Sequence, residues 1–375
     1  MNQKFYLKGV AAVAVCSSFL VSCSSSVQDD PESEAKGTPR YLALSSQTTA
    51  PIDSDIEDSF RVIYENGGTE AGESISSMYS PQLQPYGDGA ATATAENIST
   101  IGREGNLLDS HSVEGSIAVT TSSSSTGAKA ASFVYNMTSE LGGEKQLVAT
   151  ISDSGLATHT TESFPVALTT CDDGSTYWID SSDDDGSLAV KMNPDGSTRE
   201  TKIDDVSFDS AIIGEFDCVT GGVNVLVGDK EDTVSRINIT DATTSPEVSD
   251  RDSVSKPIVS EFSRSQGVTE SSLVTVMRDG TYQQIPLSVG EPVIDGNLNI
   301  NDGLVTSVTF GHDELVVSHV AEAREGDFEV STFDLSAPDN AIDHVVVKES
   351  SFNSETAQRD DLNGSRAAAS ILPLG

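Results

Sequence analysis

The chain has 375 residues, enough for one large domain or two smaller ones, and hydrophobic residues make up 36% of it, a share that still allows a solid core. It carries 59 acidic against 21 basic side chains, a formal net charge of −38 at pH 7. Such a charge repels phosphate backbones and anionic lipid headgroups, which excludes nucleic acid as a partner. It favours solubility and cationic partners without identifying one, and it is typical of a surface adapted to a salty or extracellular medium.

Residues 1–22 have the organisation of a secretory signal peptide. Lys4 and Lys8 form a short positive region, and an almost wholly apolar stretch runs over 9–20. This stretch is too short for the ~20 residues that cross a bilayer as a helix, but it fits the hydrophobic region of a signal peptide. We therefore expect residues 1–22 to be removed from the mature protein.

The next feature is a cysteine at the predicted cleavage site. Residues 20–23, Leu-Val-Ser-Cys, resemble the lipobox of bacterial lipoproteins. The resemblance covers residues 1–23 and implies that the thiol of Cys23 carries diacylglycerol, with a further acyl chain on the freed amine. Each buried CH₂ contributes ~0.8 kcal/mol, so two or three chains hold a protein stably at a membrane. The alternative is an ordinary signal peptide with a cysteine near its cleavage site.

Residues 23–40 comprise this cysteine and a predicted flexible tether. Ser, Asp and Glu predominate between 24 and 37, and such a composition cannot bury apolar area. No other segment approaches ~18 uninterrupted apolar residues, so the lipid is the expected anchor. The predicted location is the extracytoplasmic face of the cell membrane.

From residue 41 onward the pattern predicts an all-β fold. Apolar and polar residues alternate with period two, for example over 176–179, 223–227, 236–239 and 297–300, as in half-buried strands. Asp-Gly and Asn-Gly pairs, which supply the positive φ angles of tight hairpins, recur at 66–67, 88–89, 173–174, 185–186, 195–196, 279–280 and 302–303. No segment shows convincing helical periodicity.

The predicted strands form a repeat. Its copies include strands at 116–120, 132–137 and 147–151; 175–180, 187–192 and 198–203; 223–227 and 233–239; 273–277, 282–287 and 292–294; and 314–320, 328–333 and 342–347. The third strands are expected to start near residues 132, 187, 233, 282 and 328, in steps of 55, 46, 49 and 46. Four strands per ~40–50 residues is the signature of β-propeller blades.

The stretch 172–180 and the later Pro-Asp-Gly turn at 194–196 also look like a blade of the broad beta-propeller superfamily. This resemblance implies an architecture and no activity. Dividing residues 41–375 by ~47 per blade predicts a single β-propeller of about seven four-stranded blades. Residues 41–110 fit the period poorly, so six or eight blades remain alternatives, as does a pair of β-sandwiches.

The predicted propeller spans residues 41–350, and 351–375 form a polar linker with a C-terminal segment. That segment ends in an apolar stretch, 370–374, after a polar run. A tail without a packing role has no reason to end that way. We therefore expect the stretch to pack against the first blade and close the ring.

Two cysteines besides Cys23 remain in the mature chain. Cys171 and Cys218 are 47 residues apart, one repeat, and each precedes the second strand of its copy. Neighbouring blades would bring them together, and an even number of cysteines in an oxidising compartment favours a disulfide. Two free thiols or a metal site are the alternatives.

An acidic run and a pair of histidines resemble metal-binding sites, but each departs from the pattern that such a site requires. In the acidic run 180–186, calcium ligation of the EF-hand type would need Ser181 as first ligand and Met192 as closing glutamate, so that motif fails. An irregular calcium site near Asp183 and Asp185 remains an alternative to a solvated acidic hairpin. His312 and His319 are separated by an odd number, so a regular strand points them to opposite faces. No metal site or cofactor is therefore predicted.

The sequence contains no nucleophile elbow, phosphate-binding loop or His-Glu-x-x-His motif. The predicted function is a non-catalytic binding or scaffolding module that presents a protein, glycan or small-solute site of unknown identity. The alternative is a cell-envelope hydrolase or oxidoreductase that uses a propeller channel. Trp178, the sole tryptophan, is predicted to pack between blades and not to stack on a ligand.

Overall fold

A computed structural model describes residues 37–45, 57–76, 83–94, 96–113, 118–121, 129–138, 144–162, 165–180, 187–203, 216–219, 222–228, 234–241, 246–254, 263–268, 272–286, 291–300, 303–310, 314–321, 327–338, 340–347 and 370–374. These residues form 28 β-strands and no helix. Accordingly, a helix able to cross a membrane is not found among them.

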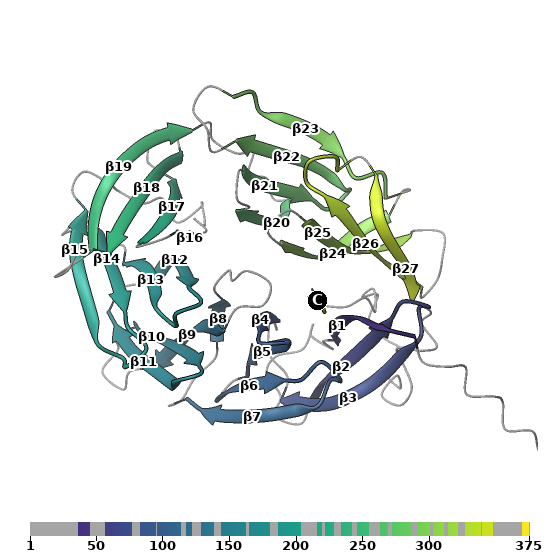
Figure 1. The fold of residues 1–375 in the computed structure, drawn as a ribbon, viewed down its shortest axis with the longest axis horizontal. Coiled ribbons are helices and arrows are strands. Elements are labelled where there is room, and N and C mark those ends of the chain that lie inside the picture. Colours follow the sequence, from purple (N-terminus) through teal and green to yellow (C-terminus); the bar gives the residue numbers. More distant parts are fainter. Residues whose placement is uncertain are drawn as a thin grey trace, which may run out of the picture. The chain divides into compact units, whose positions relative to one another are not determined.

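The described strands form seven four-stranded antiparallel sheets. Figure 1 shows the sheets arranged around a common centre, with β4, β8, β12, β16, β20 and β24 nearest to it. We number the sheets as blades in chain order and call the first strand of each blade its inner strand. The all-β class and the single β-propeller are thus confirmed, and the paired-sandwich alternative is wrong.

Blades 1 to 3 come from the N-terminal part of the chain. Blade 1 consists of β28 (Ser370–Pro373), β1 (Pro39–Ser45), β2 (Glu57–Tyr64) and β3 (Thr69–Ser76). Blade 2 consists of β4 (Gln84–Tyr86), β5 (Gly89–Ala93), β6 (Asn97–Ile101) and β7 (Leu107–Ser112). Blade 3 consists of β8 (Ala118–Thr121), β9 (Ala130–Thr138), β10 (Glu144–Ser152) and β11 (Gly155–Thr161).

Blades 4 to 7 follow in sequence. Blade 4 consists of β12 (Pro165–Thr170), β13 (Thr176–Asp180), β14 (Ser187–Met192) and β15 (Thr198–Ile203). Blade 5 consists of β16 (Phe216–Val219), β17 (Gly222–Gly228), β18 (Val234–Asp241) and β19 (Pro246–Val254). Blade 6 consists of β20 (Ser263–Val268), β21 (Ser272–Met277), β22 (Thr281–Pro286) and β23 (Ile294–Asn297). Blade 7 consists of β24 (Gly303–Phe310), β25 (Glu314–Ala321), β26 (Phe328–Asp334) and β27 (Ala341–Val347).

The hydrophobic core is divided into layers between neighbouring blades. In β1, Tyr41 and Ala43 pack in a cluster with residues of blade 7, whereas Leu42 and Leu44 pack in a cluster with residues of blade 2. Successive side chains of a strand point to opposite faces, so one strand contributes to two cores. This explains why β13 is buried along its whole length, while the outer strand β7 is mostly exposed.

Two details of the expected repeat are wrong. The strand near residue 132 is the second of its blade, β9, and the third is β10, which starts at Glu144. The third strands of blades 3 and 4 therefore start 43 residues apart, at 144 and 187, in place of the predicted 55 residues. Alternation alone could not distinguish these strands, because second and third strands are both buried on two faces.

The second wrong detail concerns 297–300. Leu298 and Ile300 follow β23 and lie outside any strand, although both are buried between blades 6 and 7. Asn299 has a φ of 52°, and its backbone N–H donates to Asn297 Oδ1 at 2.7 Å. Two buried side chains flanking a turn residue therefore produced the alternation without a strand.

The C-terminal stretch closes the ring, as its apolar composition led us to expect. Strand β28 pairs antiparallel with β1, and Ala43 lies opposite Ile371. Ile371 packs in the core between blades 1 and 7, and Leu372 packs in the core between blades 1 and 2. The backbone N–H of Leu83, just before β4, donates to Ser370 Oγ at 3.0 Å. Blade 1 is thus completed by the last described residues of the chain, which explains why 41–110 fitted the period poorly.

We expect Ile371→Ala to destabilise the domain by about 2–5 kcal/mol, because Ile371 is 0% exposed and its removal leaves a cavity at the closing seam. Ile342→Ala is the matched control, since Ile342 lies on the outer strand β27 and is 58% exposed. Denaturant unfolding of the two variants measures the difference. Equal stabilities would mean that β28 does not hold the ring closed.

Candidate functional site

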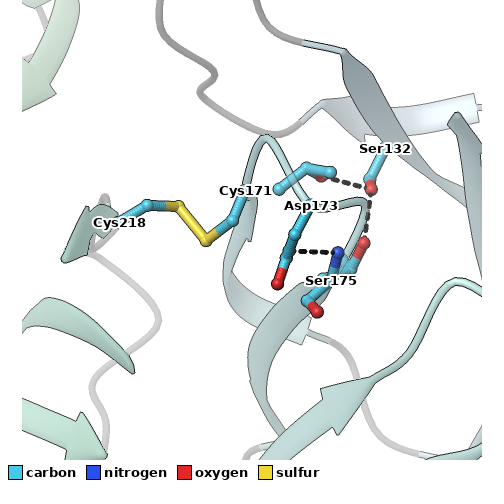
Figure 2. The surroundings of a disulfide bond; sticks show 7 residues. Ser132, Cys171, Asp173, Ser175 and Cys218 are labelled. Atoms are coloured by element: carbon cyan, nitrogen blue, oxygen red, sulfur yellow. Dashed lines mark hydrogen bonds between the residues drawn. A yellow bond between two sulfur atoms is a disulfide. The ribbon is translucent and has the colours of Figure 1, made fainter. Parts of the chain in front are cut away.

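The predicted cysteine pair is a disulfide. Cys171 directly follows β12, Cys218 is the penultimate residue of β16, and their Cα atoms are 5.7 Å apart. Figure 2 shows the bond joining the inner part of blade 4 to that of blade 5. The alternatives of two free thiols or a metal site at these cysteines are therefore wrong.

A tight turn holds Cys171 in place. The N–H of Ser175 donates to Asp173 Oδ1 at 2.8 Å, and the N–H of Gly174 donates to the carbonyl of Cys171 at 2.8 Å. Gly174 has a φ of 82°, which is unfavourable for residues with a Cβ. A side chain here would also approach Pro194 Cγ to 3.1 Å. The turn therefore depends on both residues of the Asp-Gly pair at 173–174: Asp173 accepts the hydrogen bond, and Gly174 adopts the positive φ.

Behind this turn lies a buried network of four hydroxyl groups between blades 3 and 4. Ser132 Oγ is 2.6 Å from Thr150 Oγ1 and 3.0 Å from Thr176 Oγ1, and it also contacts Thr170 Oγ1. Thr150 and Thr176 are joined at 2.7 Å. Each hydroxyl donates once and accepts twice, so the four groups can satisfy one another. These bonds join β9 and β10 of blade 3 to β12 and β13 of blade 4 and so tie the two blades together.

A second buried polar group, Asp180, ends β13 and is 6% exposed. Its two oxygens accept hydrogen bonds from Trp178 Nε1 and Thr161 Oγ1, both at 2.9 Å. Burial raises the pKa of Asp180 to about 6, against the lowering effect of these two bonds. Such a pKa suits a general acid or base, but both oxygens are already engaged and shielded from solvent.

Trp178, which donates to Asp180, is a packing residue between two blades. Its side chain is buried between blades 3 and 4, and the ring of His159 lies 5.7 Å from it, centroid to centroid. The predicted packing between blades is confirmed. Burial lowers the pKa of His159, with an opposing contribution from Glu200.

A third group gathers on blade 7. His319 is 2% exposed, and its Nε2 lies 3.1 Å from Ser331 Oγ and 3.9 Å from Glu329 Oε2. Glu329 Oε2 also lies 3.0 Å from His344 Nε2. Burial lowers the pKa of His319, which favours the neutral ring.

This arrangement differs from a nucleophilic relay. A Ser-His-acid relay needs the hydroxyl and the carboxylate on opposite ring nitrogens. Here Ser331 and Glu329 both face Nε2, while Nδ1 of His319 is buried without a hydrogen-bond partner. The geometry therefore does not activate Ser331.

Metal binding finds no support in the residues that the structure describes. They contain no group of three or more His, Cys, Asp or Glu side chains able to hold a metal ion. Cys23, Asp183, Asp185 and His312 lie outside the described residues, so the predictions made for them stay predictions.

Sequence reasoning did not find the hydroxyl network or the groups around Asp180 and His319. The missing information was cross-strand register, which places Ser132 opposite Thr150 and His319 opposite Glu329. Only Asp180 had a local signal, an acidic residue two positions after the sole tryptophan.

Comparison with known proteins does not assign the chain to a family. No family model matches the chain, and no curated protein matches it. Among solved structures it is similar to a variant of Synechocystis apocarotenoid oxygenase, with a TM-score of 0.47, 9% identity and coverage of 83% of this chain and 90% of that one. It is also similar to Citrobacter koseri AztD, with a TM-score of 0.46, 9% identity and 83% of both chains covered.

A third similar structure is the beta-propeller domain of Cps50 (Swd1) from Myceliophteria thermophila. Its TM-score is 0.44 at 10% identity, over 72% of this chain and 87% of that one. Likeness at this level carries no argument about activity. The assignment of the fold rests on the strand pairing described above.

We expect the stability of the chain to depend on pH through Asp180. Its folded pKa of about 6 lies above the ordinary value of 3.8. Protonated Asp180 therefore stabilises the fold. This contribution to the free energy of unfolding is fully present below about pH 4 and is lost as the pH rises through about 6. Relative to Asp180→Asn, which lacks this titration, the chain should lose up to about 3 kcal/mol of unfolding free energy over that window.

Denaturant unfolding at several pH values measures this difference. Asp172→Asn is the control, because Asp172 is exposed in the turn after β12. A difference between the chain and Asp180→Asn that stays constant from about pH 4 to about pH 7 would contradict the assignment.

Proposed function

We propose that the chain is a lipoprotein, anchored through acylated Cys23 to the extracytoplasmic face of the cell membrane. Its propeller acts there as a non-catalytic binding or scaffolding module for a protein, glycan or small solute. No nucleic acid is among the partners, because the net charge of −38 opposes phosphate backbones.

The observation that carries this proposal is the disulfide between Cys171 and Cys218. Disulfides persist in oxidising compartments and are rare in the reducing cytosol. The bond is independent of residues 1–23, whose pattern predicts export on other grounds. Two unrelated features of one chain thus support the same compartment.

The non-catalytic role is supported by how the polar groups are used. Three described side chains with catalytic potential, Ser132, Asp180 and Ser331, are buried and bonded to neighbouring side chains. The competing function is a cell-envelope hydrolase or oxidoreductase. A metal or cofactor that co-purifies with the full-length chain would favour that function over the binding module.

We expect Cys23→Ala to shift the protein from the membrane fraction to the medium, or to leave it unprocessed, because the thiol that accepts the lipid is gone. Labelling cells with a tagged fatty acid reads out the modification directly. Cys171→Ala serves as the control, since it retains Cys23 and should keep the label. A fatty-acid label that persists on Cys23→Ala would overturn the anchoring role.

A further inference from the structure

The disulfide between blades 4 and 5 is accessible to solvent. Cys218 is exposed and Cys171 is half-exposed, although the bond joins the inner strands of the two blades. A disulfide opens when a thiolate attacks one of its sulfur atoms, and the rate depends on access to that atom. Exposed disulfides are therefore the ones that external thiols open most readily.

The backbone around both cysteines is held by bonds that do not involve the sulfur atoms. The N–H of Cys171 donates to the carbonyl of Ser175 at 2.9 Å, and its carbonyl accepts from the N–H of Gly174 at 2.8 Å. Cys218 lies opposite Val223 in the ladder between β16 and β17. Each of these contacts lies within one blade, so opening the disulfide leaves both residues in their strands and turns.

The turn that carries Cys171 is also tied to blade 3. Thr170, the preceding residue, contacts Ser132 Oγ, and Thr176 Oγ1 lies 3.0 Å from the same oxygen. Figure 2 shows Ser132 on the side of this turn away from Cys218. The position of Cys171 is thus fixed from blade 3 as well as from blade 5, and reduction removes only the second connection.

Two carboxylates stand next to the bond. Asp172 and Asp173 directly follow Cys171, and both are exposed. The whole chain adds a formal net charge of −38. Such a field raises the local concentration of cationic reactants and lowers that of anionic ones. A positively charged thiol is therefore the class of reactant that this disulfide fits.

We propose that the Cys171–Cys218 disulfide is a site of thiol–disulfide exchange in the folded propeller, with preference for cationic thiols. The incoming thiolate bonds to Sγ of Cys218, the S–S bond breaks, and the electron pair leaves on Sγ of Cys171, which takes a proton from water. A second thiolate then displaces Cys218 from the mixed disulfide. Two external thiols are thereby oxidised to a disulfide, and the protein bond is reduced to two thiols. This inference does not depend on the lipid anchor.

The first test asks whether exchange needs unfolding. The full-length exported chain is treated with cysteamine without denaturant, and the peptides that contain Cys171 and Cys218 are quantified by alkylation and mass spectrometry. We expect Ile371→Ala and Ile342→Ala to react at the same rate within about twofold, because the folded state is the one that reacts. If exchange required global unfolding, the destabilised Ile371→Ala would react at least about 30-fold faster. Such an acceleration, or no reduction without denaturant, would refute the proposal.

The second test concerns charge. Cysteamine is compared with the anionic 2-mercaptoethanesulfonate, each rate being divided by the concentration of thiolate. We expect cysteamine to react at least about fivefold faster at low ionic strength, and this ratio to fall towards one at ~1 M salt. Asp172→Asn should lower the ratio, whereas Glu96→Gln, an exposed position in blade 2, should not. Equal rates, or a ratio that Asp172→Asn leaves unchanged, would refute the preference.

The third test follows the reduced chain. It should retain a cooperative thermal transition, lowered by about 3–8 °C because a loop constraint is lost. Cystamine, the disulfide of cysteamine, should then restore the bond between Cys171 and Cys218. Loss of the cooperative transition on reduction would mean that the bond is needed for folding, and would overturn exchange in the folded propeller. It would leave the fatty-acid label at Cys23, and so the proposed anchor, unaffected.

Discussion

A ring of sheets must be sealed where its first and last members meet, and here one antiparallel pairing makes the seal. Strand β28 supplies the inner strand of a blade whose other three strands come from the N-terminal part of the chain. An unpaired β1 would expose a row of backbone donors and acceptors at the centre of the ring. Pairing with β28 removes this edge and brings two apolar side chains into two different cores.

Closure has a consequence for the polar residues. Once every blade has a neighbour on both faces, polar side chains on the middle strands are buried and need partners. The four hydroxyls around Ser132 bond to one another, and Asp180 accepts from Trp178 and Thr161. The elevated pKa of Asp180 is thus a consequence of packing between blades. The printed contacts of Ser132 and Asp180 are with neighbouring side chains of the fold, and this supports the proposed binding role.

The sequence predicted correctly those features that depend on neighbouring residues or on the repeat length. It did not predict features that depend on which residues lie opposite one another in paired strands. Strands β14 and β15 were predicted with correct bounds because Asp-Gly turns flank an alternating pattern. The disulfide followed from the repeat length, since Cys171 and Cys218 occupy equivalent positions. By contrast, β9 was assigned to the wrong place in its blade, and 297–300 was taken for a strand. The groups around His319 could not be foreseen, because they depend on which residues lie opposite one another across β25, β26 and β27.

The central claim is that β28 is an integral strand of blade 1 and not a tail resting on it. Hydrogen–deuterium exchange followed by mass spectrometry tests this directly on the peptide that covers 370–375. If the claim holds, the described amides of this peptide exchange as slowly as those of β13, which is buried along its whole length. Exchange of these amides within the shortest labelling time, while β13 stays protected, would contradict the account.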